Sequence, residues 1–120
     1  MLRSVLMTGL AMALTTTAGT LAAQSRPPQF AACAACHSIT PDKQAKIGPG
    51  LHGVVGRQAG SLPNYKYSPA LAGYKKKWDR ATLIAFLTNP KGTVPGNKMV
   101  YPGQKPEVAA AIADYLKGLQ

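Results

Sequence analysis

Acidic residues are scarce in this chain of 120 residues, because only four Asp and Glu stand against 14 Lys and Arg, for a formal net charge of +10. No grouping of a general acid, a base and a nucleophile is present, which argues against the turnover of a substrate. A strongly positive protein is steered towards acidic protein faces and, more weakly, towards anionic membrane surfaces. The lysines are scattered and no nucleic-acid-binding motif appears, so we expect no nucleic-acid partner. A basic surface that is merely solvated is the alternative.

A long apolar run is also missing. The stretch "SVLMTGLAMAL", residues 4–14, is broken by Thr8 and Gly9 and falls short of the roughly 20 residues that span a bilayer. Arg3 precedes it and the small residues of "TLAAQ" follow it, an arrangement typical of a secretory signal peptide. We therefore expect a signal peptide over residues 1–23, one domain over residues 24–120, and export to the periplasm. An uncleaved membrane anchor is the alternative.

Strand patterns and internal repeats are absent, and the regular elements that remain are helical. Asp79 is a suitable N-cap for a helix over Arg80–Thr88, with the apolar stripe Leu83, Phe86 and Leu87. A second helix is expected in "KPEVAAAIADYLKG", which begins at Pro106, ends at Gly118 and turns Val108, Ile112, Tyr115 and Leu116 inward. A short helix is expected in "RPPQFAACAACH", starting at Pro27 or Pro28 and placing Phe30, Cys33 and His37 on one face.

Residues 38–77 and the stretch "KGTVPGNKMVYPGQ" are rich in glycine and proline and predict loops. About forty residues of loop are unusual inside a small domain unless something other than side chains occupies the centre. The loops therefore favour a bulky cofactor.

Cysteine and histidine are few, yet three of them stand within five residues: Cys33, Cys36 and His37. A disulfide between such close thiols would add little stability, and a redox-active C-x-x-C is usual in a strand-rich frame that this chain lacks. A zinc site needs four ligands, and only His52 and acidic side chains remain to complete it. The fourth possibility, C-x-x-C-H in an exported chain, is covalent haem attachment with the histidine on the iron.

Methionine occurs only once after the leader, as Met99 in the loop sequence "VPGNKMVYPG". A thioether is a usual second ligand of a haem iron. Packing as an apolar gap-filler is the alternative for this side chain.

The mature chain resembles the class I c-type cytochromes, the group of mitochondrial cytochrome c and its small bacterial relatives. The resemblance rests on "CAACHSI", "GPGLHGVVGRQAGSLPNYKYSPAL", "FLTNPKGTVPGNKM" and "ADYLKG", in this order and at the family's spacing. It implies an all-α fold of three main helices, with long loops wrapped around one covalently bound haem c. It also implies that the protein without haem is largely disordered.

The resemblance implies a role for eight residues. Cys33 and Cys36 would form the thioethers, His37 and Met99 would bind the iron, and Pro49 would accept a hydrogen bond from His37, while Arg57, Tyr67 and Trp78 would approach a haem propionate. Plain surface charge is the alternative for Arg57, and plain core packing for the two aromatic residues. His52 is a rival iron ligand, at a position that the family fills with a non-ligating histidine. Two residues depart from the family: Phe86 stands where many relatives have a tyrosine whose hydroxyl reaches the methionine sulfur, and Asn97 stands where the mitochondrial proteins have threonine. We expect both changes to bear on the reduction potential and on the strength of the Met99 bond.

An iron with both axial positions filled passes single electrons. We therefore expect a monomeric periplasmic electron carrier between a quinol-oxidising complex or a dehydrogenase and a terminal oxidase or reductase. The lysines that the resemblance places near the haem edge would dock briefly onto acidic faces of these partners; they are Lys66, Lys91, Lys98 and Lys105. The alternative is a haem enzyme or ligand sensor in which Met99 dissociates and opens the iron.

Overall fold

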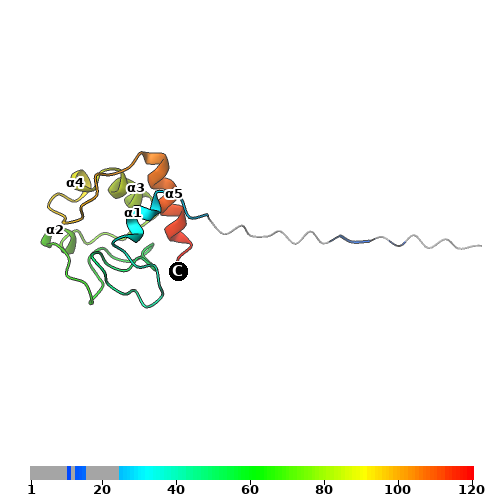
Figure 1. Cartoon of the computed structure of the whole chain (residues 1–120), viewed down its shortest axis with the longest axis horizontal. Coiled ribbons are helices and arrows are strands. Elements are labelled where there is room, and N and C mark those ends of the chain that lie inside the picture. The colour runs from blue at the N-terminus through cyan, green and yellow to red at the C-terminus, as the bar shows by residue number, and fades with distance from the viewer. Residues whose placement is uncertain (1–10, 12, 16–24) are drawn as a thin grey trace, which may run out of the picture.

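The computed structural model describes residue 11, residues 13–15 and residues 25–120. The signal peptide expected over 1–23 and its cleavage near Gln24 lie outside the described residues, apart from four positions. The elements in chain order are α1 (Phe30–Ala34), α2 (Pro69–Ala72), α3 (Arg80–Thr88), α4 (Pro90–Thr93) and α5 (Pro106–Lys117) (Figure 1). Between the described residues the only strand-like pairing is one isolated bridge, Gln58 with Lys77. The expected all-α class is confirmed.

Helix α3 has the predicted limits because both of its ends carry local signals. The Asp79 carboxylate accepts a hydrogen bond from the Thr82 amide at 2.7 Å, which caps the first turn. At the other end Asn89 leaves helical geometry before a proline. The predicted stripe is the buried face of the helix, formed by Leu83, Phe86 and Leu87.

Helix α5 packs against α3 and supplies the other half of the core. Pro106 begins it and Gly118 caps its end, as predicted. Its buried residues are Ala109, Ile112, Ala113 and Leu116. Val108 and Tyr115, which were expected to point inward, are only partly buried and pack at the edge of the core. The two alanines are 1% exposed or less, so small side chains form part of the buried face of the helix.

Helix α1 is shorter than expected, and neither Pro27 nor Pro28 belongs to it. Both prolines lie in the preceding turn, where the Pro27 carbonyl accepts from the Phe30 amide at 3.0 Å. Phe30 is completely buried and meets Tyr115 of α5 edge-on, with ring centroids 4.9 Å apart. His37 lies beyond the helix, although its amide still bonds the Cys33 carbonyl at 2.9 Å. The three residues of the expected face all line the same cavity, although only Phe30 and Cys33 belong to the helix.

Two helices, α2 and α4, lie in segments that were predicted as loops. Each has four residues with a proline in its first turn, and each is capped by a side chain, Ser68 for α2 and Asn89 for α4. A single turn is too short to show a helical period in the sequence, so only the caps could have indicated these elements.

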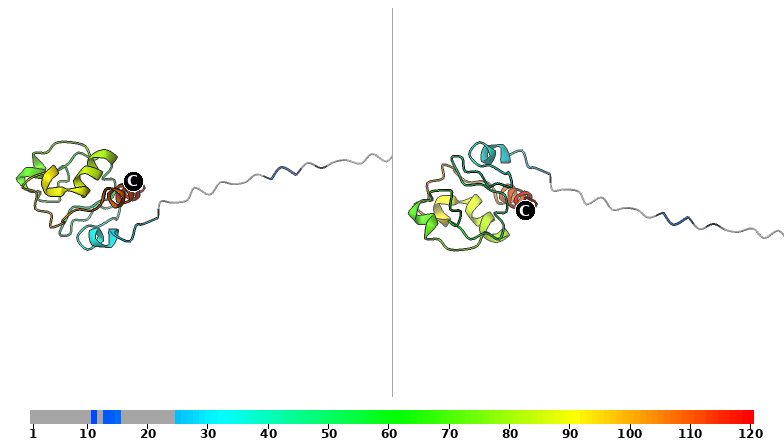
Figure 2. Two further views of the ribbon diagram at one scale, coloured as in Figure 1. Left: turned by 90° about the horizontal axis from the view of Figure 1, so that it is seen from above. Right: turned by 90° about the horizontal axis from the view of Figure 1, so that it is seen from below.

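The long loop segment between α1 and α3 runs over the molecule opposite the helices, as the cyan and green traces in Figure 1 show. Figure 2 shows α5 nearly end-on, with α1 on one side of it and α3, against which it packs, on the other. No helix among the described residues is both long enough and apolar enough to cross a bilayer.

Candidate haem site

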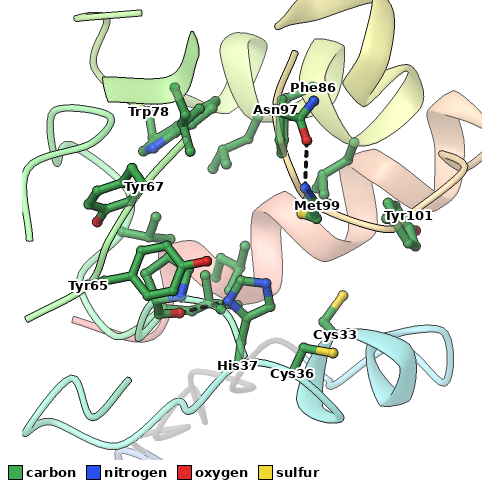
Figure 3. A pocket seen from close by; sticks show the side chains of 18 of the residues that line it. Cys33, Cys36, His37, Tyr65, Tyr67, Trp78, Phe86, Asn97, Met99 and Tyr101 are labelled. Carbon is green, nitrogen blue, oxygen red and sulfur yellow. Dashed lines mark hydrogen bonds between the residues drawn. The ribbon is translucent and has the colours of Figure 1, made fainter. Parts of the chain in front are cut away.

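A cavity of about 410 Å³ lies between the helices and the long loop. Eight of the twelve buried core residues line it: Phe30, Val54, Trp78, Leu83, Phe86, Leu87, Ile112 and Leu116. The remaining wall comes from the loops and from the short helices α1 and α2, and it brings together the imidazole of His37, the side chains of Cys33 and Cys36 and the thioether of Met99 (Figure 3). The cavity is thus mostly apolar, and a few side chains bring sulfur and imidazole nitrogen atoms into it.

The His37 ring is held in one orientation by the loop that follows it. Nδ1 lies 2.7 Å from the Pro49 carbonyl oxygen. Because a carbonyl only accepts, Nδ1 carries the hydrogen and Nε2 keeps its lone pair. The pKa of His37 is lowered by burial, which outweighs the opposing effect of the bond to Pro49, and Lys46 lowers it further. A neutral imidazole with a free Nε2 is the form that binds a metal.

Gly48 provides the room for this ring. The residue is buried, and a Cβ built on it would lie 2.6 Å from His37 Nδ1 and 2.8 Å from Nε2. The Gly48 amide also donates to the Cys36 carbonyl at 2.8 Å, so the backbone cannot easily withdraw. Glycine is therefore needed here for close approach and not for an unusual backbone angle.

We expect Gly48→Ala to destabilise the haem-loaded protein by about 1 to 3 kcal/mol, because the added methyl group overpacks the His37 ring. Guanidinium unfolding followed by circular dichroism measures this change. Gly73→Ala is the matched control, since that glycine has helical backbone angles and its nearest neighbour would be at 3.3 Å. Equal unfolding midpoints for the two variants would contradict the close-approach role.

Cys33 and Cys36 form no disulfide in the structure, and both are partly buried at the cavity. Burial raises the pKa of the Cys33 thiol. A raised pKa is the opposite of what an attacking redox thiol needs. In the part of the chain that the structure describes, no three His, Cys, Asp or Glu side chains gather as a metal site, which also disfavours the zinc alternative.

Met99 reaches the cavity from the loop between α4 and α5, across from His37 and the two cysteines (Figure 3). Its amide donates to the Asn97 side-chain oxygen at 2.9 Å. Phe86, buried in α3, lines the same cavity and carries no hydroxyl for the sulfur. His52 is not among the lining residues, so the structure does not support it as the rival ligand.

The three predicted propionate contacts all line the cavity. The Arg57 guanidinium donates to the Gly50 and His52 carbonyls at 2.8 and 2.7 Å. Burial lowers the pKa of Arg57, and neighbouring Tyr67 acts in the opposite direction. Trp78 is 7% exposed and packs against Phe86. The structure thus brings these donors to one region, while their role towards a propionate stays a prediction.

Two aromatic residues at the cavity were not singled out from the sequence. Tyr65 lines the wall, donates its hydroxyl to the Ile47 carbonyl at 3.0 Å and packs edge-on against Tyr67. Tyr101 lines it near Cys33, and burial raises the pKa of its phenol. Their positions next to predicted site residues, in "YKY" and "MVY", were the available signal.

The residues present fit a haem. The wall is mostly apolar, a neutral imidazole is fixed on one side with a thioether across from it, and two thiols stand beside the imidazole. Imidazole, thioether and paired cysteines are the donor set of a c-type haem protein.

Comparison with known proteins agrees with this donor set. No protein-family model matches the chain. The chain is 48% identical over 94 residues to cytochrome c2 iso-2 of Magnetospirillum fulvum, covering 78% of this chain and 97% of that protein. It is 44% identical over 86 residues to cytochrome c of Nigella damascena, covering 71% and 78%. In structure it matches cytochrome cH from Methylobacterium extorquens with a TM-score of 0.68 and 43% identity, over 73% of this chain and 89% of that one.

The similarity extends through most of the described domain and is high over nearly the whole length of the bacterial relatives. The all-α fold and the cavity with its paired cysteines agree with it. This chain belongs to the class I c-type cytochromes.

Proposed function

We propose that this protein is an exported carrier of single electrons, in which His37 Nε2 and the Met99 sulfur bind the haem iron from opposite sides. The observation that carries the proposal is the placement of these two side chains across one apolar cavity, with Cys33 and Cys36 beside the histidine. As a member of its family the chain is an electron-transfer protein and not an enzyme.

Its cofactor is one haem c, attached covalently through Cys33 and Cys36. When bound, this group supplies the one-electron couple of its iron. The two cysteines hold it in place, and the bond from His37 to the Pro49 carbonyl orients the imidazole and raises its basicity as a ligand. The Met99 thioether would be the second iron ligand, and a thioether ligand favours a relatively high reduction potential.

The surrounding side chains keep the site dry and closed to other reactions. Leu83, Phe86 and Leu87 are all less than 8% exposed and cover one wall. With imidazole and thioether both bound, the iron would have no free site for oxygen, peroxide or a substrate. Arg57, Tyr67 and Trp78 are proposed to donate hydrogen bonds to a propionate, which needs buried donors to stay ionised.

The optical spectrum of the purified haem protein tests this ligation. We expect the ferric form to show the weak long-wavelength charge-transfer band of methionine-ligated haem, and the reduced form to resist carbon monoxide. Rapid carbon monoxide binding near neutral pH would instead favour a ligand sensor or a haem enzyme that opens at Met99.

Redox partners are proposed to be proteins with acidic faces, such as a quinol-oxidising complex, a dehydrogenase or a terminal oxidase, and contact with them would be brief. Two exposed apolar side chains that line the cavity offer a small surface for such a brief contact. They are Val100, which is fully exposed, and Ile47, which is 77% exposed. Lys98 also lines the cavity, with its ammonium group 4.7 Å from the Tyr65 ring centre and bonded to the Lys66 carbonyl. Of the four lysines expected near the haem edge, it is the one that lines the cavity.

We expect the second-order rate of electron transfer to an acidic protein partner to fall about tenfold or more between 10 and 200 mM salt, because screening removes the steering field. Stopped-flow mixing with such a partner measures the rate. A small neutral oxidant provides the control and should show almost no salt dependence. A salt-independent rate with the protein partner would contradict steering by the basic surface.

Export to the periplasm is proposed from the leader pattern of residues 1–23. Fractionation of producing cells, followed by N-terminal sequencing of the haem protein, tests it. A soluble periplasmic protein beginning near Gln24 is expected. Haem protein retained in the membrane with Met1 intact would show that the leader acts as an anchor.

A further inference from the structure

We propose that Asn97 is the positioning residue for Met99, holding the methionine loop on helix α4 so that the thioether stays on the iron. This inference rests on the proposed ligation by Met99. Asn97 is 4% exposed, and every polar atom of its side chain is engaged. Its Nδ2 donates to the Pro90 and Val94 carbonyls, both at 2.9 Å, and its Oδ1 accepts from the Met99 amide at 2.9 Å (Figure 3).

The backbone of Asn97 is tied to the same helix. Its amide donates to the Val94 carbonyl at 3.1 Å, and its carbonyl accepts from the Lys91 ammonium group at 2.6 Å. One residue therefore carries five hydrogen bonds, four of them to α4 or the residue after it and one to Met99. A residue bonded in this way transmits the position of α4 to the methionine.

Helix α4 is itself fixed in place by hydrogen bonds and by burial. The Asn89 side chain caps it through the Gly92 amide at 3.0 Å, and the Thr93 hydroxyl donates to the Ala85 carbonyl of α3 at 2.9 Å. Pro90, whose carbonyl accepts from Asn97, is among the largest fully buried side chains. The chain of contacts thus runs from the core helix α3 through α4 to the loop that carries Met99.

The hydrogen bonds of Asn97 compensate for the missing hydroxyl at Phe86. A phenylalanine offers no hydroxyl to the methionine sulfur, so the sulfur receives no polar support from that wall. The support reaches the backbone of Met99 instead. Moving the loop away from the iron would break the bonds of Asn97 and leave buried carbonyl and amide groups without partners, which is unfavourable.

The test measures how easily an external ligand displaces Met99. Imidazole is titrated into the ferric haem protein, and its apparent dissociation constant is read from the loss of the charge-transfer band. For Asn97→Ala we expect this constant to fall at least tenfold, because the variant loses all three side-chain bonds. Asn97→Thr keeps one hydroxyl and should give an intermediate constant.

Asp79→Ala is the matched control, because it removes the N-cap of α3 and lowers stability without touching the methionine loop. We expect it to lower the guanidinium unfolding midpoint while changing the imidazole constant less than threefold. Equal imidazole constants for Asn97→Ala and the wild type, in proteins that show the band, would overturn the role of Asn97 and leave the ligation by Met99 standing. A wild-type protein without the band would overturn the ligation proposal and this inference with it.

Discussion

Replacing both Cys33 and Cys36 with serine is expected to leave the chain largely unfolded. The thiols are the points at which the haem is attached, and eight of the twelve buried core residues line the cavity beside them. A cavity of about 410 Å³ left unfilled would cost roughly 10 kcal/mol at about 24 cal/mol per Å³. Single domains are stable by only about 5 to 15 kcal/mol, so the loss removes most or all of the stability.

Far-UV circular dichroism and the dispersion of amide NMR signals measure this outcome. A Cys33→Ala, Cys36→Ala protein is the matched control, because alanine favours helix more than serine does and should nevertheless unfold the chain. If either double variant gave native-like circular dichroism, the haem would not be the centre of the core.

Substituting Met99 is expected to abolish the charge-transfer band and to open the iron. In Met99→Ala the reduced protein should bind carbon monoxide rapidly, because no thioether competes for the position. The reduction potential should fall by on the order of 0.1 V, within the roughly 0.8 V over which axial ligands set haem potentials. Absorption spectroscopy, carbon monoxide mixing and a redox titration measure these changes.

Two variants test whether the band depends on the Met99 sulfur itself, on the shape of that side chain or on the rival ligand His52. Met99→Leu keeps an apolar side chain of similar volume, so it should lose the band as completely as alanine does while remaining folded. His52→Gln should keep the band, since His52 does not line the cavity. Loss of the band in His52→Gln together with its retention in Met99→Leu would contradict Met99 as the second iron ligand.

The helices show which local signals can be read without a structure. Helix α3 was predicted to the residue, because an aspartate cap and an Asn-Pro stop mark its ends in the sequence itself. Helix α1 was extended too far, since a run of alanines favours helix but does not say where tertiary contacts end it. Helices α2 and α4 were missed, because one turn shows no period and depends on its cap and its neighbours.

The residues of the site also differ in how far the sequence reveals them. Cys33, Cys36 and His37 lie within five residues, so their spacing indicated haem attachment, and the other segments that resemble the family strengthened that interpretation. Tyr65 and Tyr101 were overlooked, because their positions two residues from Tyr67 and Met99 were the only signal in the sequence, and such closeness does not say which way a side chain points. Asn97 stood out in the sequence as a departure from the family close to Met99, but its hydrogen bonds could not be foreseen, since its partners become neighbours only when α4 forms.

By itself, the order of residues determined what this protein attaches and the class of fold that encloses it, because paired thiols followed by histidine and a set of capped helices are local patterns. The tertiary structure alone decided which side chains surround the cavity, and how Met99 is held opposite His37. The reason is physical: a covalent attachment motif works over five residues, whereas a cavity wall and a buried hydrogen-bond network need segments from the whole chain to meet.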